Sequence, residues 1–416
     1  MRYNKFMEKY KVIIIGGGAV GLTCAASLHI AGKDVLLLER GERLGRKLAA
    51  TGNGQGNVGN LSLSSENYFS ADEGKTERLD TLFQTYGIAE VKDFYASLGV
   101  FLIADERGRV YPSGRQASAL SDALRFCVQD KGITVRLNAL VTDVEKVGTG
   151  FIVTVKTSES SERFFAENVL VCTGGKAAKN FGTDGAGYVL TGKFGHTCTP
   201  LYPSLVQLKC DVKHTKTLKG IRVNDARVSA YVGDKKLTDV TGDLIFTDYG
   251  VSGDAIFRIS AFLADKIDKQ ARLSIDLLPV LSKQELLCFL QAKKKNCPNV
   301  ETSELLGGVL NNQVGRAVIK RYGGDLLSIV EGVKNFTLEV TGSLGFDYAQ
   351  VTKGGVPFNE VDDSFQSKKA EGLYLAGELL DVDGECGGYN LHFAFACARV
   401  IANALNKKLG VDRGQV

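Results

Sequence analysis

A glycine-rich turn between an apolar strand and a helix, close to the start of the chain, most limits the folds that it can adopt. Residues 11–15 form a β-branched run without polar alternation, which is typical of a parallel strand buried on both faces. The run leads directly into Gly16-x-Gly18-x-x-Gly21. A small-residue helix is expected over 18–31 and a second apolar strand over 34–38. This order predicts an α/β fold with a dinucleotide-binding parallel sheet.

Each glycine of this turn has its own task in binding a dinucleotide. Gly16 permits the tight turn, Gly18 lets the backbone approach a pyrophosphate, and Gly21 lets the helix pack closely on the strand. Glu39, at the end of the second strand, is placed to accept hydrogen bonds from ribose hydroxyls. We therefore predict that a cofactor is bound here by Gly16, Gly18, Ala19, Val20, Gly21, Glu39 and Arg40.

Composition excludes several classes of protein. With 416 residues the chain is long enough for two or three domains, and 44% hydrophobic with 24% charged residues excludes a disordered chain. A net charge of +4 at this length does not indicate a surface that binds nucleic acid. The glycines interrupt the apolar stretch over 12–32, so we interpret it as the first βα turn rather than as a membrane span or an export signal.

The nine cysteines are widely separated, with no C-x-x-C pair and no histidine at zinc spacing. Reduced thiols and the absence of a metal site are the simplest interpretation. Because disulfides are rare in the cytosol, this pattern predicts a cytoplasmic protein.

The pattern of apolar strands and glycine-rich turns in the first third of the chain continues to about residue 195 and returns after about residue 341. Helices are expected over 78–98 and 118–131, and strands over 107–112, 135–138, 142–147, 150–157 and 167–172. Short strands between these segments, such as 206–209 and 226–232, indicate an antiparallel, β-barrel-like insert. A capping box at Ser282-x-x-Glu285 begins a helical part over about 281–325, with further helix in 302–322. The predicted domains are 1–195 with 341–416, and an inserted domain over 196–340 on the substrate side.

Two further strand ends decide which dinucleotide is bound. Residues 372–378 form a short apolar strand that ends in Gly377-Glu378, which resembles the second flavin signature of two-dinucleotide-fold flavoproteins. Residues 170–175 resemble the strand that ends in Thr173-Gly174 and closes the same FAD-binding fold. Non-covalent FAD is therefore predicted, with Glu378 beside its ribityl chain.

Four longer motifs make the resemblance specific. The segments 45–57, 250–253, 351–356 and 387–390 resemble the bacterial YhiN/BaiN-type flavoprotein family over nearly the whole chain. The resemblance implies a FAD domain made from both chain ends and interrupted by a barrel-like insert. Activities assigned in that family include NAD(P)H-linked reduction of conjugated 3-oxo steroids and oxidation of small aminoketones. The chain departs from the family pattern at Gln55-Gly56 and at Asp248, which weakens the transfer of either substrate.

The same motifs supply further candidate ligands of the flavin. The loop after residue 45 offers two cations, hydroxyl and amide groups and exposed backbone N–H groups. The alternative for Arg46 and Lys47 is a solvated surface turn. A helix N-terminus near residue 388 is placed to face the flavin pyrimidine ring. The predicted cofactor ligands here are Arg46, Lys47, Thr51, Gly52, Asn53, Asn57, Gly388, Tyr389 and Asn390.

The catalytic acid or base is left open by the sequence. His392, Cys386 and Tyr389 are candidates because they lie in the segment expected near the isoalloxazine. The alternatives are a core or capping histidine and an inert packing thiol. Asp381, Asp383 and Glu385 could transfer protons beside a flavin, but a solvated turn or a capping role is the preferred interpretation.

The predicted function is a FAD-dependent oxidoreductase that reduces a small conjugated carbonyl compound. NAD(P)H would deliver hydride to flavin N5, binding transiently because no second glycine fingerprint is present. The alternatives are an oxidase of a small amine or aminoketone that releases peroxide, a FAD-dependent RNA-modifying enzyme, and a flavin-binding protein without turnover. A small-molecule partner is expected, without nucleic acid or membrane, and the oligomeric state is left open.

Overall fold

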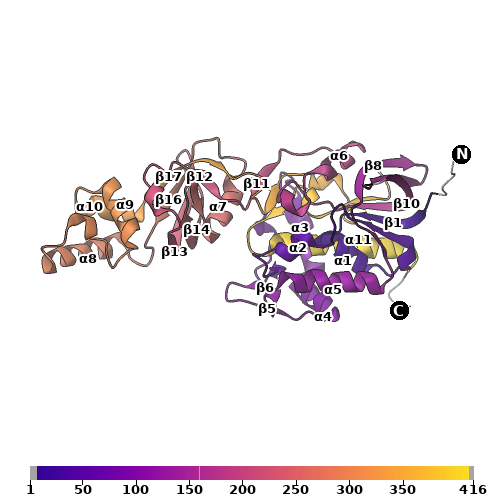
Figure 1. Ribbon diagram of the computed structural model, residues 1–416, viewed down its shortest axis with the longest axis horizontal. Coiled ribbons are helices and arrows are strands. Elements are labelled where there is room, and N and C mark those ends of the chain that lie inside the picture. The colour runs from indigo at the N-terminus through magenta and orange to yellow at the C-terminus, as the bar shows by residue number, and fades with distance from the viewer. Residues whose placement is uncertain (1–6, 159, 412–416) are drawn as a thin grey trace. The chain divides into compact units, whose positions relative to one another are not determined.

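The computed structural model describes residues 7–158 and 160–411, which divide into two compact units (Figure 1). Unit 1 comprises residues 1–201 and 351–416, and unit 2 spans Tyr202–Gln350. The sequence placed the corresponding boundaries at 196 and 340. Among the described residues, no helix is long and apolar enough to cross a membrane.

Unit 1 is built on a seven-stranded sheet in the order β7-β2-β1-β10-β9-β8, with β19 beside β10. Strands β7, β2, β1, β10 and β19 run parallel, and β8 and β9 add an antiparallel edge. The strands are β1 Lys9–Ile15, β2 Val35–Leu38, β7 Thr134–Arg136, β8 Leu140–Val147, β9 Gly150–Lys156, β10 Ser161–Val171 and β19 Leu373–Leu375. Strand β1 is buried from Val12 to Ile15, as a central parallel strand must be. The predicted fold class is confirmed.

Helices from both chain ends cover this sheet. The indigo helix α1 packs against the yellow helix α11 and against α5 (Figure 1). The helices of unit 1 are α1 Ala19–Ser27, α2 Arg46–Ala50, α3 Lys75–Thr85, α4 Ile88–Ser97, α5 Ala117–Asp130, α6 Ala186–Gly192 and α11 Tyr389–Lys408. Asn406 of α11 accepts a hydrogen bond from the N–H of His29 at 2.9 Å and donates one to the carbonyl of Ser27, so the last helix caps the first.

The prediction of one helix in unit 1 is wrong, because two helices form there. The pattern over 78–98 predicts a single helix, but the chain forms α3 and α4 with a break at Tyr86 and Gly87. Gly87 has extended backbone at φ −82° and ψ −168°, so the chain turns there and each helix buries its own face.

Two small sheets complete unit 1. Strands β3 Gly59–Asn60, β5 Leu102–Ala104 and β6 Arg109–Pro112 form one, and β4 Tyr68–Phe69 pairs with β20 Asp383–Gly384 in the other. The β4–β20 pair joins an N-terminal segment to the segment just before α11. Strand β18, Val351–Lys353, returns the chain to unit 1.

Unit 2 contains a closed barrel in the order β12-β15-β14-β13-β16-β17. Its long hairpin, β13 with β14, turns through Gly233-Asp234, where Gly233 has φ +55°. Alternate residues of the strands point inward around Phe246 and Phe336, which are fully buried. The strands are β12 Leu208–Cys210, β13 Arg222–Val232, β14 Lys235–Phe246, β15 Gly250–Ser252, β16 Ala271–Asp276 and β17 Phe336–Ser343.

The helices of unit 2 are α7 Asp254–Leu263, α8 Lys283–Asn296, α9 Asn312–Tyr322 and α10 Leu326–Lys334. The capping box at Ser282 and Glu285 begins α8 as predicted. The helix expected over 302–322 begins only at Asn312, because Asn311 caps it through the N–H of Gln313 at 3.0 Å. Helix α10 lies wholly beyond the expected limit at residue 325. Asp325 is its N-cap and accepts a hydrogen bond from the N–H of Ser328 at 2.9 Å.

Candidate dinucleotide site

The glycine turn at the end of β1 is packed too tightly for any side chain at two of its positions. A Cβ atom at Gly21 would lie 1.9 Å from the carbonyl oxygen of Gly16. A Cβ atom at Gly16, which has φ +113°, would lie 2.5 Å from the carbonyl oxygen of Cys172. These contacts hold α1 against the ends of β1 and β10, as close helix-on-sheet packing requires.

Gly18 differs from its neighbours because the described parts of the chain leave open space beside it. An added Cβ atom would meet no atom within 4 Å. Gly18 is the N-cap of α1, and neither a side-chain cap nor an acid occupies the first turn of that helix. The helix N-terminus therefore presents backbone N–H groups and open space to an anion, as a pyrophosphate site needs.

Glu39 lies at the end of β2 beside the same turn. Its carboxylate accepts from the N–H of Gly17 at 2.9 Å and from the N–H of Gly41 at 2.7 Å. Each oxygen keeps lone pairs for further donors. The two backbone bonds fix the carboxylate in place, and its role as a ribose ligand stays a prediction.

The C-terminal flavin signature lies directly against the N-terminal one. A Cβ atom at Gly377, which has φ +69°, would come within 2.6 Å of Cγ2 of Val20 in the first turn of α1. Thr173 and Gly174 follow β10, whose last residues pair with both β1 and β19. The structure thus brings three sequence motifs, which lie between residues 16 and 378, to one edge of the sheet.

Glu378 is the centre of a network that sequence reasoning did not foresee. Its Oε2 lies 2.6 Å from Nζ of Lys47, and its Oε1 accepts from the N–H of Thr352 at 3.0 Å. The hydroxyl oxygen of Thr352 accepts from the N–H groups of Lys176 and Ala177, at 2.7 and 2.9 Å. The network joins α2, β18, the loop after β10 and the turn after β19.

Thr352 is therefore a positioning residue for Glu378. Thr352 belongs to the motif at 351–356, which the sequence analysis used only for the family resemblance. That motif could have indicated this role.

The N-terminus of α11 lies against a buried hydrogen-bond acceptor. A Cβ atom at Gly388, which has φ +101°, would lie 2.5 Å from Oδ1 of Asn57. That amide oxygen is buried and has no hydrogen-bond partner among the described residues. A buried acceptor without a donor is costly, and the N3–H of a flavin ring is a donor of the required kind. Asn390 meanwhile holds the preceding loop by pairing with both backbone groups of Gly384, each at 2.8 Å.

Other predicted ligands serve mainly to fix the loops in the structure. Arg40 pairs with Asp184 at 2.7 Å, and Arg46 donates to the carbonyl of Asn180 at 3.0 Å. The Thr51 hydroxyl donates to the carbonyl of Leu48 at 2.7 Å. Gly52 and Asn53 have left-handed backbone, at φ +58° and +55°, and are exposed in the turn after α2. Their assignment as cofactor ligands stays a prediction.

The catalytic candidates occupy different environments. His392 is fully buried, its Nε2 donates to the carbonyl of Tyr86 at 2.8 Å, and burial lowers its pKa to about 4. Tyr389 is also buried, and its carbonyl accepts from the hydroxyl of Tyr68 at 2.9 Å. Cys386 is half-buried. His392 is neutral at pH 7, so in this position it holds no proton on Nδ1 to donate.

The acids after Glu378 are not a solvated loop, which corrects the sequence-based interpretation. Asp381 and Asp383 are 4% and 1% exposed. Asp381 accepts from the N–H of Ala71 at 3.1 Å, and Asp383 lies in β20, which pairs with β4. Burial raises the pKa of Asp381.

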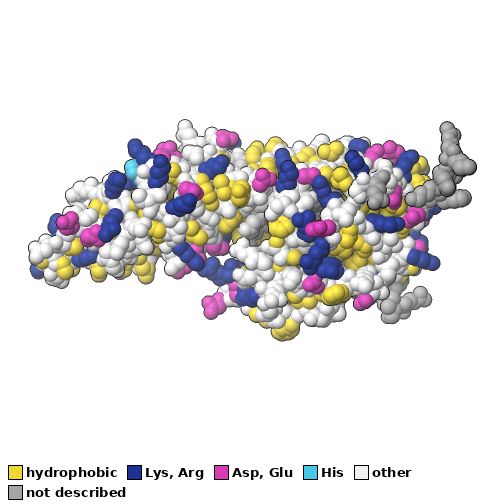
Figure 2. All heavy atoms as spheres, viewed as in Figure 1, with side chains coloured by type: hydrophobic (Ala, Val, Ile, Leu, Met, Phe, Trp, Pro, Cys, Tyr) yellow, Lys and Arg dark blue, Asp and Glu magenta, His cyan; other side chains and the backbone are white. Residues whose placement is uncertain are grey.

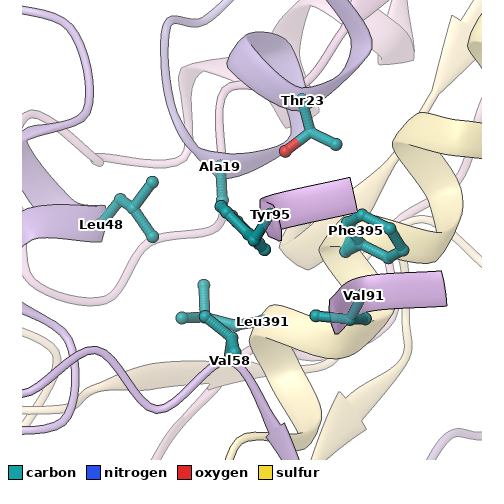
Figure 3. A pocket seen from close by; sticks show the side chains of 8 residues that line it. All are labelled: Ala19, Thr23, Leu48, Val58, Val91, Tyr95, Leu391 and Phe395. Atoms are coloured by element: carbon teal, nitrogen blue, oxygen red, sulfur yellow. The ribbon is translucent and has the colours of Figure 1, made fainter. Parts of the chain in front are cut away.

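A small pocket lies where the first turns of α1 and α11 meet. Figure 3 shows Ala19, the first residue of α1, and Leu391, in the first turn of α11, lining the same pocket. Leu48, Val58 and Val91 complete an apolar floor. The N-termini of α1 and α11, predicted to face the pyrophosphate and the flavin ring, thus lie beside the same largely apolar pocket.

A family comparison decides the identity of this fold. The model described as "HI0933-like protein Rossmann domain" matches residues 10–404. The chain belongs to this family. The resemblance to YhiN/BaiN-type flavoproteins is confirmed, and the chain is a FAD-dependent oxidoreductase.

Relatives of this family member match nearly its whole length. The chain is 32% identical to "3-dehydro-bile acid delta(4,6)-reductase" of Clostridium scindens, over 95% of the chain and 98% of the relative. It is 26% identical to "Ribosomal RNA dihydrouridine synthase" of Escherichia coli, over 96% of the chain and 98% of the relative. The solved structure of a 3-ketosteroid-delta4-(5alpha)-dehydrogenase from Rhodococcus jostii RHA1 shares the fold, with a TM-score of 0.53, 16% identity and coverage of 97% and 98%.

The residues of the site fit FAD. The open backbone at Gly18 suits a pyrophosphate, the oriented carboxylate of Glu39 suits a ribose, and the partnerless oxygen of Asn57 suits a ring N–H. Glu378 reaches the same edge of the sheet while bound to Lys47.

Proposed function

We propose that this chain reduces carbon–carbon double bonds conjugated with a carbonyl group, using NAD(P)H as the hydride donor. The observation that carries the proposal is the full-length similarity, at 32% identity, to a relative named as a delta(4,6)-reductase of 3-dehydro-bile acids. A 3-oxo group conjugated with such double bonds makes the distal carbon electrophilic. The substrate class is therefore an electron-poor alkene.

The reaction adds one hydride to the β-carbon and one proton to the α-carbon, while NAD(P)H becomes NAD(P)⁺. When bound, FAD would supply the hydride-transfer chemistry that the side chains of the protein lack. The protein positions the reactants. The N-terminus of α1 would hold the pyrophosphate and Glu39 the ribose, while Lys47 and the backbone of Thr352 orient Glu378.

The relatives named as dihydrouridine synthases support the same reaction class. Uracil carries a C5=C6 double bond conjugated with the C4 carbonyl, and its reduction to dihydrouracil also adds a hydride and a proton. Two groups of full-length relatives thus share a conjugated-alkene reduction, although their named substrates differ. No feature of the described residues favours the amine oxidase alternative.

Anaerobic half-reactions test the proposal. The holoprotein is mixed with NADPH or NADH under nitrogen, and the visible flavin absorbance is followed by stopped flow. We expect bleaching, then recovery on addition of a 3-oxo-4,6-diene steroid, with a product that gains two hydrogen atoms by mass spectrometry. Flavin that no nicotinamide bleaches, or that only oxygen restores with stoichiometric peroxide, would contradict the proposal.

A further inference from the structure

Asp381 is a buried carboxylic acid close to the dinucleotide site. It follows Glu378 in the segment between β19 and β20, and it is 4% exposed. Acids at the surface have a different environment, since Figure 2 shows them among Lys and Arg side chains on the face in view. Because burial disfavours the charged form of a carboxyl group, a buried acid beside a cofactor site is a candidate for proton transfer.

Backbone contacts hold the carboxyl group of Asp381 in a defined place. Its Oδ2 accepts a hydrogen bond from the N–H of Ala71 at 3.1 Å, and its own N–H donates to the carbonyl of Val356 at 2.7 Å. Gly355, at φ +155°, lets this segment approach closely, because a Cβ atom there would lie 3.0 Å from the backbone nitrogen of Asp381. The carboxyl group is therefore oriented before any substrate binds.

Tyr188 of α6 connects Asp381 with the network around Glu378. The hydroxyl of Tyr188 lies 3.4 Å from the carbonyl oxygen of Glu378. Burial raises the pKa of Tyr188 most, and the charges of Glu378, Cys198 and Asp381 raise it further. Because interactions between charges weaken with distance, this coupling places Asp381 beside the dinucleotide site. Cys198 is exposed, so water can reach this side of the group.

Groups from several elements act on the carboxyl group of Asp381. Burial raises its pKa, and hydrogen bonds from the N–H of Ala71 and the hydroxyl of Thr199 lower it. The charge of Lys353 in β18 also lowers this pKa, whereas the charge of Asp72 raises it. Asp381 is thus a weaker acid than a carboxyl group in water, so it keeps a proton more readily.

Lys353 is the cation that acts on this acid. Its Nζ lies 4.4 Å from the ring centre of Phe69, which pairs with Asp383 between β4 and β20. Burial lowers the pKa of Lys75 at the start of α3, and Asp383 and Lys353 act on it in opposite directions. The ammonium group of Lys353 is therefore placed to stabilise the carboxylate that remains when a proton leaves Asp381.

We propose that Asp381 donates the proton that completes the reduction of the conjugated alkene, an inference that rests on the proposed function. Once the β-carbon has received a hydride, the substrate is an enolate. The O–H bond of Asp381 breaks, the electron pair of the enolate forms a C–H bond at the α-carbon, and the carbonyl group forms again. Asp381 is left as a carboxylate, which takes up a proton from water.

The first test separates this proton step from the supply of hydride in the full-length holoprotein. Asp381→Asn keeps an acceptor for the N–H of Ala71 but has no acidic proton. Bleaching of the flavin by NAD(P)H should be unchanged. Recovery on addition of a 3-oxo-4,6-diene steroid should be about 100-fold slower, as the loss of a general acid predicts. The matched control Asp143→Asn, at a half-buried acid in the edge strand β8, should alter neither step.

Equal slowing of both steps in Asp381→Asn would overturn the proposal, because it would indicate damage to the flavin site. Recovery as fast as in the unaltered protein would also overturn it, and would leave the proposed function intact. Failure of the steroid to restore the flavin absorbance of the unaltered protein would instead refute the proposed function.

The pH dependence of the recovery distinguishes proton donation from a structural role. A donor must be protonated, so the rate for the unaltered protein should fall as the pH rises through the pKa of Asp381. Asp381→Asn should lack this fall. Lys353→Gln removes a charge that lowers this pKa, so the fall should move to higher pH. A fall that persists in Asp381→Asn, or that does not move upward in Lys353→Gln, would overturn the proposal.

Unfolding of the protein without FAD tests the titration of Asp381 independently of the reaction. A raised folded-state pKa contributes stability below the unfolded value of about 3.9, and this stability is lost as the pH rises through the folded-state pKa. Asp381→Asn should therefore unfold at a higher urea concentration than the unaltered protein at pH 7, and the difference should close towards pH 4. A difference that does not depend on pH would contradict the assignment of Asp381 as a buried acid that gains and loses a proton.

Discussion

At the scale of single residues, two glycines of one turn have opposite tasks that substitution can separate. Gly21→Ala places a Cβ atom 1.9 Å from the carbonyl of Gly16, whereas Gly18→Ala meets nothing within 4 Å. We predict that Gly21→Ala lowers the free energy of unfolding by about 2–3 kcal/mol, as overpacking does. Gly18→Ala should change it by less than about 1 kcal/mol and weaken FAD binding at least tenfold. Urea unfolding and flavin titration measure both; equal stability of the two variants would refute the assignment.

His392 makes the stability of the protein depend on pH. The unfolded chain takes up a proton near the ordinary histidine pKa of about 6.5, but the folded chain does so only near 4. Acidification through this interval therefore favours the unfolded state, and stability present above pH 6.5 is lost towards pH 4. The contribution is on the order of 3 kcal/mol.

The variant His392→Gln isolates this contribution, because glutamine can donate to the carbonyl of Tyr86 without titrating. We expect its free energy of unfolding to fall less steeply than that of the unaltered protein between pH 6.5 and 4. Other groups cancel in the comparison. Parallel curves for the two proteins would show that His392 is not the titrating group.

At the scale of elements, the pair of Lys47 and Glu378 joins α2 to the turn after β19. The side chains are 25% and 19% exposed, so solvent screens them only in part. A double-mutant cycle with Lys47→Met and Glu378→Gln should give a coupling energy of about 1 kcal/mol in the unfolding of the protein without FAD. The control cycle on Lys11 and Asp34, a more exposed pair at 3.2 Å, should give about zero. Additive effects at Lys47 and Glu378 would contradict a preassembled site.

Elements with a local signal were predictable, and those set by tertiary contacts were not. The capping box at Ser282 and the glycine turn after β1 are short-range patterns, and both appear in the structure as expected. The break between α3 and α4 was missed because a helical periodicity runs through Gly87. Asp325 is a local cap that was overlooked.

Long-range contacts within the site could not be predicted from local patterns. The burial of Asp381 depends on Ala71, which lies 310 residues away in the chain. The same holds for Thr352 and the backbone of Lys176. The sequence identified the motifs of the site, but not the network that connects them.

At the scale of the whole molecule, the two units have separate hydrophobic cores. One core contains residues from Tyr10 to Leu190 and from Val356 to Leu405, and the other contains residues from Leu208 to Val340. Separate cores predict two unfolding transitions in calorimetry. FAD should raise the midpoint of the transition of unit 1 alone, since a ligand stabilises only the folded unit that binds it. A single transition that shifts as a whole with FAD would contradict this.

The central claim is that glycine motifs from both ends of the chain form one site for a single, non-covalent FAD. The most direct measurement is the visible spectrum of the purified protein, followed by denaturation and identification of the released flavin by mass. The account predicts one FAD for each chain, released in full. A colourless protein that added FAD does not restore, or a flavin that stays attached to the denatured chain, would contradict it.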